Sequence, residues 1–151
     1  MTAQPVEFEL DELYRDLILD HYRHPRNHTP LAHPTCATDG ENPLCGDQLT
    51  LQAEVVDGRL QRIGFEGRGC SISQASTSMM TECVQGKSLA EARALIGEFK
   101  AMMLHGAPPT PALGDLEALQ GVRKFPVRVK CASLGWNVLE QLLTEQERGT
   151  R

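Results

Sequence analysis

The chain has 151 residues and a formal net charge of −5, from 15 Lys+Arg against 20 Asp+Glu. Apolar residues make up 40% and aromatic residues only 5%, so we expect one domain over residues 1–151 with an aliphatic core. The acidic balance argues against a nucleic-acid-binding protein, which needs a dense basic face. The chain has no apolar run that could span a bilayer and no secretory signal at its N-terminus. We therefore expect a cytoplasmic protein that binds neither nucleic acid nor membrane.

The first half of the chain predicts a helix followed by strands. Apolar residues recur at helical spacing over residues 10–23, and His24-Pro25 ends that helix. Residues 25–43 predict a loop with a short strand at about 35–38. Residues 48–56 and 59–66 alternate and flank Asp57-Gly58, a favoured tight-turn dipeptide. This pattern predicts a β-hairpin whose second strand buries its Gln61–Ile63–Phe65 side.

The second half predicts mainly helices. One follows Cys70 and ends at Gly86, and Ser88 with Glu91 forms a capping box for the next. Residues 105–114 predict a loop, 115–120 a short helix, 125–130 an extended segment and 132–146 a last helix. The expected fold is α+β, with a small antiparallel sheet of about three strands packed against N-terminal and C-terminal helices.

The five cysteines are the main chemical feature of the sequence. An odd number in a cytoplasmic chain does not suggest a disulfide framework, because that compartment keeps thiols reduced. Metal binding, thiol chemistry and plain burial stay open for each. The five are Cys36, Cys45, Cys70, Cys83 and Cys131.

Three of these cysteines lie at boundaries between predicted elements. Cys45 precedes the first hairpin strand and Cys70 follows the second, so antiparallel pairing brings Cys45, Asp47 and Cys70 to one end of the sheet. Cys70 and Cys131 are each expected at a helix N-terminus, where exposed N–H groups stabilise a thiolate.

These residues together could bind a metal ion. Three thiolates and one carboxylate supply the four ligands of tetrahedral zinc, and thiolates also suit iron–sulfur chemistry. With a divalent metal the site would carry a net charge of −2, and we expect Arg68, Arg128 and Lys130 to offset it. The sequence has no CxxC or other local zinc pattern, so a metal site and a thiol site both remain possible.

The other thiols and histidines are weaker candidates. Cys83 is expected in the middle of a helix near Met79 and Met80, where packing is the simpler interpretation. Cys36 is ambiguous. Four histidines of the N-terminal region are expected on a loop face rather than as ligands: His21, His24, His28 and His33.

Four segments resemble the U-type iron–sulfur cluster assembly proteins, the family of IscU, SufU and the N-terminal part of NifU. "LYRDLILDHYRHPRN" (13–27) is similar to the family's first helix and Pro-x-Asn element. "NPLCGDQLTL" (42–51), "FEGRGCSISQASTSMM" (65–80) and "VRVKCASLGW" (127–136) resemble its three cysteine motifs in order. The resemblance covers about residues 10–145.

The resemblance implies a site of Cys45, Asp47, Cys70 and Cys131 that holds zinc, or iron of a nascent [2Fe–2S] cluster bound by the three cysteines. It also implies a pyridoxal-phosphate-dependent cysteine desulfurase of the SufS type as sulfur donor, and a downstream assembly complex of the SufBCD type. Cys45 is our choice as the sulfur acceptor, because it lies between Pro43 and Gly46 at the head of a strand.

Three departures from the Isc type favour the SufU branch. Lys130 stands where a histidine precedes the third cysteine, "KFPVRVK" (124–130) replaces a Leu-Pro-Pro-Val-Lys stretch, and residues 86–125 lengthen the intervening segment. These departures argue against an Hsp70-type chaperone partner. The favoured function is therefore a zinc-dependent sulfur acceptor, a sulfurtransferase-like carrier rather than a free-standing enzyme. A cluster scaffold is the first alternative and a structural zinc module the second.

Overall fold

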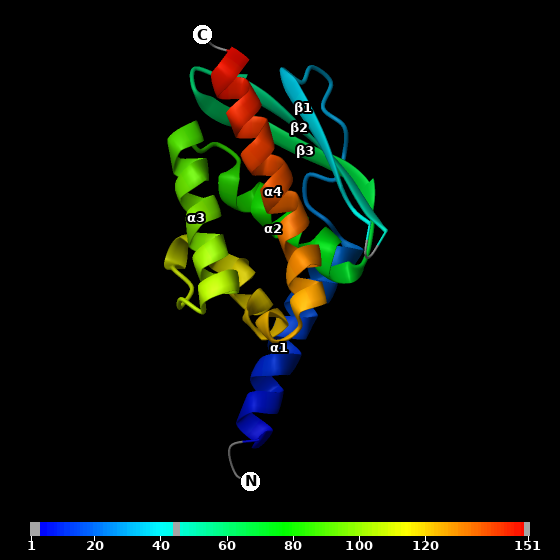
Figure 1. Cartoon of the computed structure of the whole chain (residues 1–151). Helices are drawn as coiled ribbons and strands as arrows, with labels where there is room; N and C mark the ends of the chain where they lie inside the picture. The colour runs from blue at the N-terminus through cyan, green and yellow to red at the C-terminus, as the bar shows by residue number, and fades with distance from the viewer. Residues whose placement is uncertain (1–3, 44–45, 150–151) are drawn as a thin grey trace.

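The computed structural model describes residues 4–43 and 46–149 as a three-stranded antiparallel sheet with helices packed on it (Figure 1). The strands are β1 (Cys36–Asn42), β2 (Asp47–Val56) and β3 (Arg59–Arg68), in the order β1-β2-β3. The helices are α1 (Gln4–Arg23), α2 (Ser71–Val84), α3 (Leu89–His105), the 3₁₀ segment η1 (Pro111–Lys124) and α4 (Pro126–Gly149). The predicted α+β class is confirmed.

The predicted hairpin is present, with one correction to its second strand. Asp57 and Gly58 both have positive φ, 52° and 74°, which suits a two-residue turn of the type that matches strand twist. A register shift between Glu54 and Val55 changes which side chains of β3 face inward. Leu60 is therefore fully buried in place of the predicted Gln61, while Ile63 and Phe65 are buried as expected.

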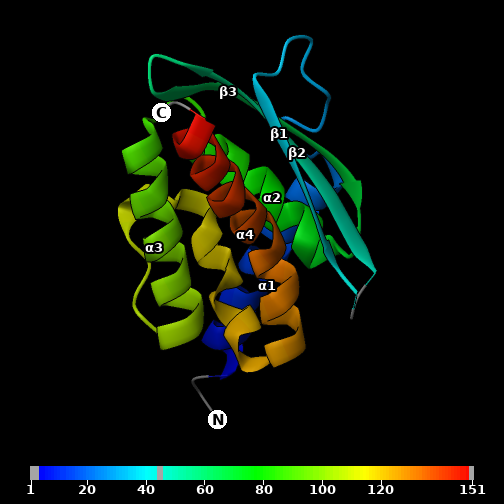
Figure 2. The same ribbon diagram turned by 45° about the horizontal axis from the view of Figure 1, so that its top comes forward.

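The helices pack against the sheet and against one another. α4 lies along β1 and β2, α2 packs against α4 and β3, and α1 packs against α2; Figure 2 shows α4 and α2 next to the sheet, with α3 farther from it. Trp136 of α4 is fully buried and stacks on Phe99 of α3 with ring centroids 4.5 Å apart. None of the helices in the described part of the chain has the length and apolarity that a bilayer span requires.

Several predicted boundaries hold and others are wrong: α1 begins at Gln4 rather than at residue 10, and β1 spans Cys36–Asn42 rather than about 35–38. α1 ends at Arg23, α2 is followed by Gly86 with φ 85°, and Ser88 and Glu91 form the predicted capping box. Only Phe125 of the predicted extended segment 125–130 is extended. Residues 126–130 are helical, because α4 already begins at Pro126, where the fixed φ of proline suits the first helical turn. The short helix predicted at 115–120 is the centre of the longer η1, which is kinked at Gly114.

Candidate metal centre

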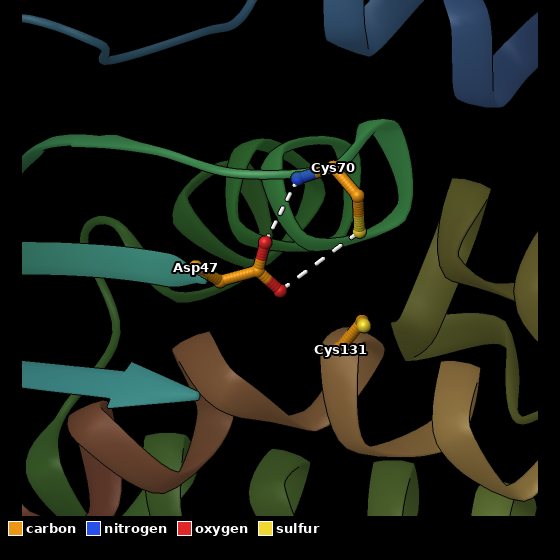
Figure 3. Close-up of side chains that lie close together, drawn as sticks. All are labelled: Asp47, Cys70 and Cys131. Carbon is orange, nitrogen blue, oxygen red and sulfur yellow. Dashed lines mark hydrogen bonds between the residues drawn. The ribbon is translucent and has the colours of Figure 1, made fainter. Parts of the chain in front are cut away.

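The candidate site lies where β2 begins, α2 begins and the first turns of α4 pass (Figure 3). Asp47, Cys70 and Cys131 each offer one ligand atom there, and these atoms all lie within 4.8 Å of one another. Asp47 and Cys131 are fully buried, and Cys70 is half-buried. Cys45, the fourth residue of the predicted set, lies outside the described residues.

The pairing of β2 with β3 explains why Asp47 and Cys70 meet. Gln48 lies opposite Arg68 in the register, so the chain that leaves β3 passes directly beside Asp47. The backbone N–H of Cys70 donates to Asp47 Oδ1 at 2.8 Å, and Cys70 Sγ lies 3.9 Å from Asp47 Oδ2. Antiparallel geometry thus places these two residues together, as the sequence predicted.

Cys70 is the N-cap of α2. Its sulfur accepts the backbone N–H of Ser73 at 3.5 Å, and the positive end of the helix dipole lies against it. Both features place N–H groups at the sulfur, where they can stabilise a ligand atom of a metal site. The expected helix N-terminus at Cys70 is therefore present.

Cys131 reaches the site from a different position than predicted. It lies within α4, which begins at Pro126, so it is not at a helix N-terminus. Its sulfur instead accepts a hydrogen bond from Nδ2 of Asn42 at 3.9 Å. Asn42, which the sequence analysis missed, is the last residue of β1 and pairs with Asp47.

The donor set fits zinc. Zn–S bonds of about 2.3 Å and Zn–O bonds of about 2.0–2.2 Å put neighbouring tetrahedral ligand atoms roughly 3.5–3.8 Å apart. The distance of 3.9 Å from Cys70 Sγ to Asp47 Oδ2 is close to that spacing, and all three donor atoms lie within 4.8 Å of one another.

The three predicted cations lie around this end of the molecule and are exposed. Arg68 ends β3, while Arg128 and Lys130 lie on the first turns of α4 beside Cys131. Their expected role in offsetting the charge of a thiolate-rich site stays a prediction.

The two remaining cysteines lie away from this cluster. Cys36 begins β1 and pairs with Ala53, at the opposite end of the strand from Asn42. The Cys83 sulfur contacts the carbonyl oxygens of Ala112 and Leu113 at 3.5 and 3.4 Å. Burial raises the pKa of both thiols, that of Cys83 to about 11, which disfavours the thiolate that metal binding requires.

A second group of possible ligand atoms lies between α1, α2 and η1. His21, Glu82 and Asp115 bring their polar atoms within 4.8 Å. His21 is not on a loop face, as the sequence predicted, but fully buried on α1. Its Nδ1 lies 2.8 Å from Ser78 Oγ and its Nε2 lies 3.3 Å from Asp115 Oδ2. We assign this group a structural role.

The fold and the cluster together define a small α+β protein with a largely buried centre of two cysteines and one aspartate. Residues 13–132 match the model of the NifU-like N-terminal domain family, and the chain belongs to that family.

Known relatives resemble the chain over most of its length. It is 44% identical over 142 residues to the zinc-dependent sulfurtransferase SufU of Bacillus subtilis, covering 93% of this chain and 95% of that protein. It is 40% identical over 136 residues to the iron–sulfur cluster assembly scaffold protein IscU of Streptococcus pyogenes, covering 89% and 85%.

A solved structure agrees with the fold. It is that of a putative iron–sulfur cluster assembly scaffold protein for the SUF system from Fervidobacterium islandicum. It superimposes with a TM-score of 0.79 at 34% identity, covering 84% of this chain and 93% of that one.

Proposed function

We propose that this protein is a zinc-dependent sulfur acceptor in iron–sulfur cluster assembly, and that Cys45, Asp47, Cys70 and Cys131 hold the zinc. The observation that carries this proposal is the convergence of Asp47, Cys70 and Cys131 on one buried point. The similarity to a protein named as a zinc-dependent sulfurtransferase supports it.

The donor of the sulfur is a cysteine desulfurase that carries a persulfide on its own cysteine. Zinc, when bound, keeps its cysteine ligands deprotonated at neutral pH. The Cys45 thiolate attacks the outer sulfur of the persulfide, so that a new S–S bond forms at Cys45 while the S–S bond of the donor breaks. The donor cysteine leaves as a thiolate, and Cys45 now carries the persulfide.

The other two cysteines are less suited to this attack. Cys131 is fully buried within α4, and its sulfur accepts the Asn42 amide. Cys70 is held by the Ser73 N–H at its sulfur and by Asp47 at its backbone. Both are expected to stay in place as ligands, which supports Cys45 as the acceptor.

The turnover of the cognate cysteine desulfurase tests the proposal. The zinc-loaded protein should accelerate turnover, and the metal-stripped protein should not. Asp47→Ala should speed metal exchange and weaken the acceleration, whereas Cys83→Ser, which changes a thiol outside the cluster, should preserve both. Equal acceleration by loaded and stripped protein would overturn the zinc dependence.

A cluster scaffold is the second candidate, favoured by the 40% identity to a protein named as an IscU scaffold. Thiolates ligate [2Fe–2S] clusters as well as zinc. Anaerobic reconstitution with iron and sulfide distinguishes the two. A stable visible absorbance, together with acceleration that survives zinc removal, would favour the scaffold over the sulfur acceptor.

A further inference from the structure

Two cysteines of the candidate centre receive N–H groups from different sources. The Cys70 sulfur accepts the Ser73 N–H at 3.5 Å, because Cys70 caps α2. The Cys131 sulfur cannot use a helix N-terminus, because it lies inside α4, where backbone N–H groups bond within the helix. The side-chain amide of Asn42 lies there instead, with Nδ2 at 3.9 Å from the sulfur.

Asn42 is well placed for this contact. It is 8% exposed, ends β1 and pairs with Asp47 across the start of β2. Asn42 and Asp47, which stand on either side of residues 43–46 in the sequence, contact different cysteines: Asp47 contacts Cys70, and Asn42 contacts Cys131.

The hydrogen bond from Asn42 to Cys131 would stabilise the negative charge of a metal-loaded centre. A divalent metal with three thiolates and one carboxylate carries a net charge of −2, and burial makes uncompensated charge costly. Hydrogen bonds from N–H groups to ligand sulfurs stabilise that charge without adding a ligand. Groups that hydrogen-bond metal ligands set their orientation and donor strength, and losing one typically costs about 10–100-fold in metal affinity.

We infer that Asn42 is a positioning residue of the metal centre, which holds the Cys131 thiolate by its side-chain N–H and controls how firmly the site retains its metal. This inference rests on the same cysteine site as the proposed function and adds a residue to it. The amide does for Cys131 what the N-terminus of α2 does for Cys70.

Zinc release from the intact protein to a chelator tests the inference. Asn42→Ala removes the donor and should accelerate zinc release by about 10-fold or more. Asn42→Asp keeps the shape, places a carboxylate beside the thiolate and should accelerate release further. Asn137 provides the matched control, since it lines the same surface cavity as Asn42 and Lys130 but is exposed. Asn137→Ala and Asn137→Asp should release zinc at the wild-type rate.

The absorption spectrum of the cobalt(II)-substituted protein provides a second measurement, and it would not change if Asn42 had only a structural role. Loss of an N–H donor raises the energy of the sulfur electrons, so the sulfur-to-cobalt charge-transfer band should shift to lower energy in both Asn42 variants. The band arises only from molecules that hold metal, so partial unfolding does not obscure it. Wild-type release rates and band positions in both Asn42 variants would overturn the inference.

Neither measurement uses the desulfurase, so the inference and the proposed function can fail separately. An effect of Asn42 on zinc release and on the cobalt band, in a protein that does not stimulate a desulfurase, would uphold the inference and overturn the function. Stimulation of the desulfurase, with no effect of the Asn42 substitutions on zinc release or on the cobalt band, would uphold the function and overturn the inference.

Discussion

The carboxylate of Asp47 accepts the backbone N–H of Cys70 at 2.8 Å, and this bond joins the first residue of β2 to the N-cap of α2. Gly69 makes the approach possible. A Cβ on Gly69 would collide with Oδ1 of Asp47 and would lie 2.8 Å from its Cγ, closer than side-chain atoms pack. Glycine is therefore required here so that the chain can pass over the carboxylate.

Gly69→Ala should weaken both the metal centre and the fold. The added methyl group displaces Asp47 from Cys70, so we expect zinc retention to fall by about 10-fold or more and stability to fall by about 1–3 kcal/mol. Zinc content after a chelator pulse and thermal unfolding of the metal-free protein measure the two effects. Gly97→Ala is the control, because an added Cβ on this exposed α3 residue meets nothing within 4 Å. Equal zinc retention in the two variants would show that the approach to Asp47 does not matter.

Much of the fold could be predicted because its signals are local. The Asp57-Gly58 turn and the Ser88–Glu91 capping box each need only neighbouring residues. The inward position of Leu60 could not be predicted, because it depends on a register shift at Glu54/Val55 that has no sequence signature. Pro126 at the first helical position is a sequence signal for the helical state of residues 126–130. The alternation of apolar and basic residues in this segment favoured a strand instead.

The candidate site also has one part that could be predicted from the sequence and one part that could not. Asp47 and Cys70 meet because antiparallel strands bring their ends together, which the hairpin prediction already contains. Asn42 was missed because nothing in the sequence aligns the end of β1 with the start of α4. That contact depends on how α4 packs along the sheet, which is a tertiary property.

Cys83 should prove dispensable for the metal centre and slow to react. Burial raises its pKa to about 11, so the thiol stays protonated at pH 8 and becomes a thiolate only as the pH approaches that value. Alkylation of Cys83, followed by mass spectrometry of its peptide, should be slow at pH 8 and should accelerate with rising pH. Alkylation at the rate of an unhindered small-molecule thiol at pH 8 would contradict this prediction.

The capping box of α3 should make a pH-dependent contribution to stability. The backbone N–H of Ser88 donates to Glu91 Oε1 at 2.9 Å and lowers the pKa of that carboxyl below its ordinary value of 4.5. A lowered folded-state pKa stabilises the protein above the unfolded pKa, and this stabilisation is lost as the pH falls through the folded value.

Glu91→Ala should therefore lower the melting temperature at pH 7, and the difference from wild type should shrink as the pH falls below 4.5. Melting curves at several pH values measure this trend. Glu117→Ala, at an exposed position of η1, should show no comparable trend. A Glu91→Ala difference that stays constant into acid would mean that the carboxylate is not responsible.

His21 should be the most important histidine for stability. It is fully buried on α1, between Ser78 of α2 and Asp115 of η1. Ser78 Oγ accepts the backbone N–H of Arg26 at 2.8 Å, which leaves its own proton available for His21 Nδ1. In that arrangement Nε2–H donates to Asp115, and all three groups are satisfied. His21 thus joins three helical segments through one ring.

His21→Ala leaves both a cavity and a buried hydroxyl without its partner, so we expect a loss of about 2–4 kcal/mol of unfolding free energy. Asp115→Ala should cost less than about 1 kcal/mol, because that carboxylate is 52% exposed and screened by water. His24→Ala, an exposed position just after α1, should stay within about 0.5 kcal/mol of wild type. Denaturant unfolding of the metal-free proteins measures all three. If His21→Ala were as stable as His24→Ala, the prediction would be wrong, and apolar packing alone would hold α1, α2 and η1 together.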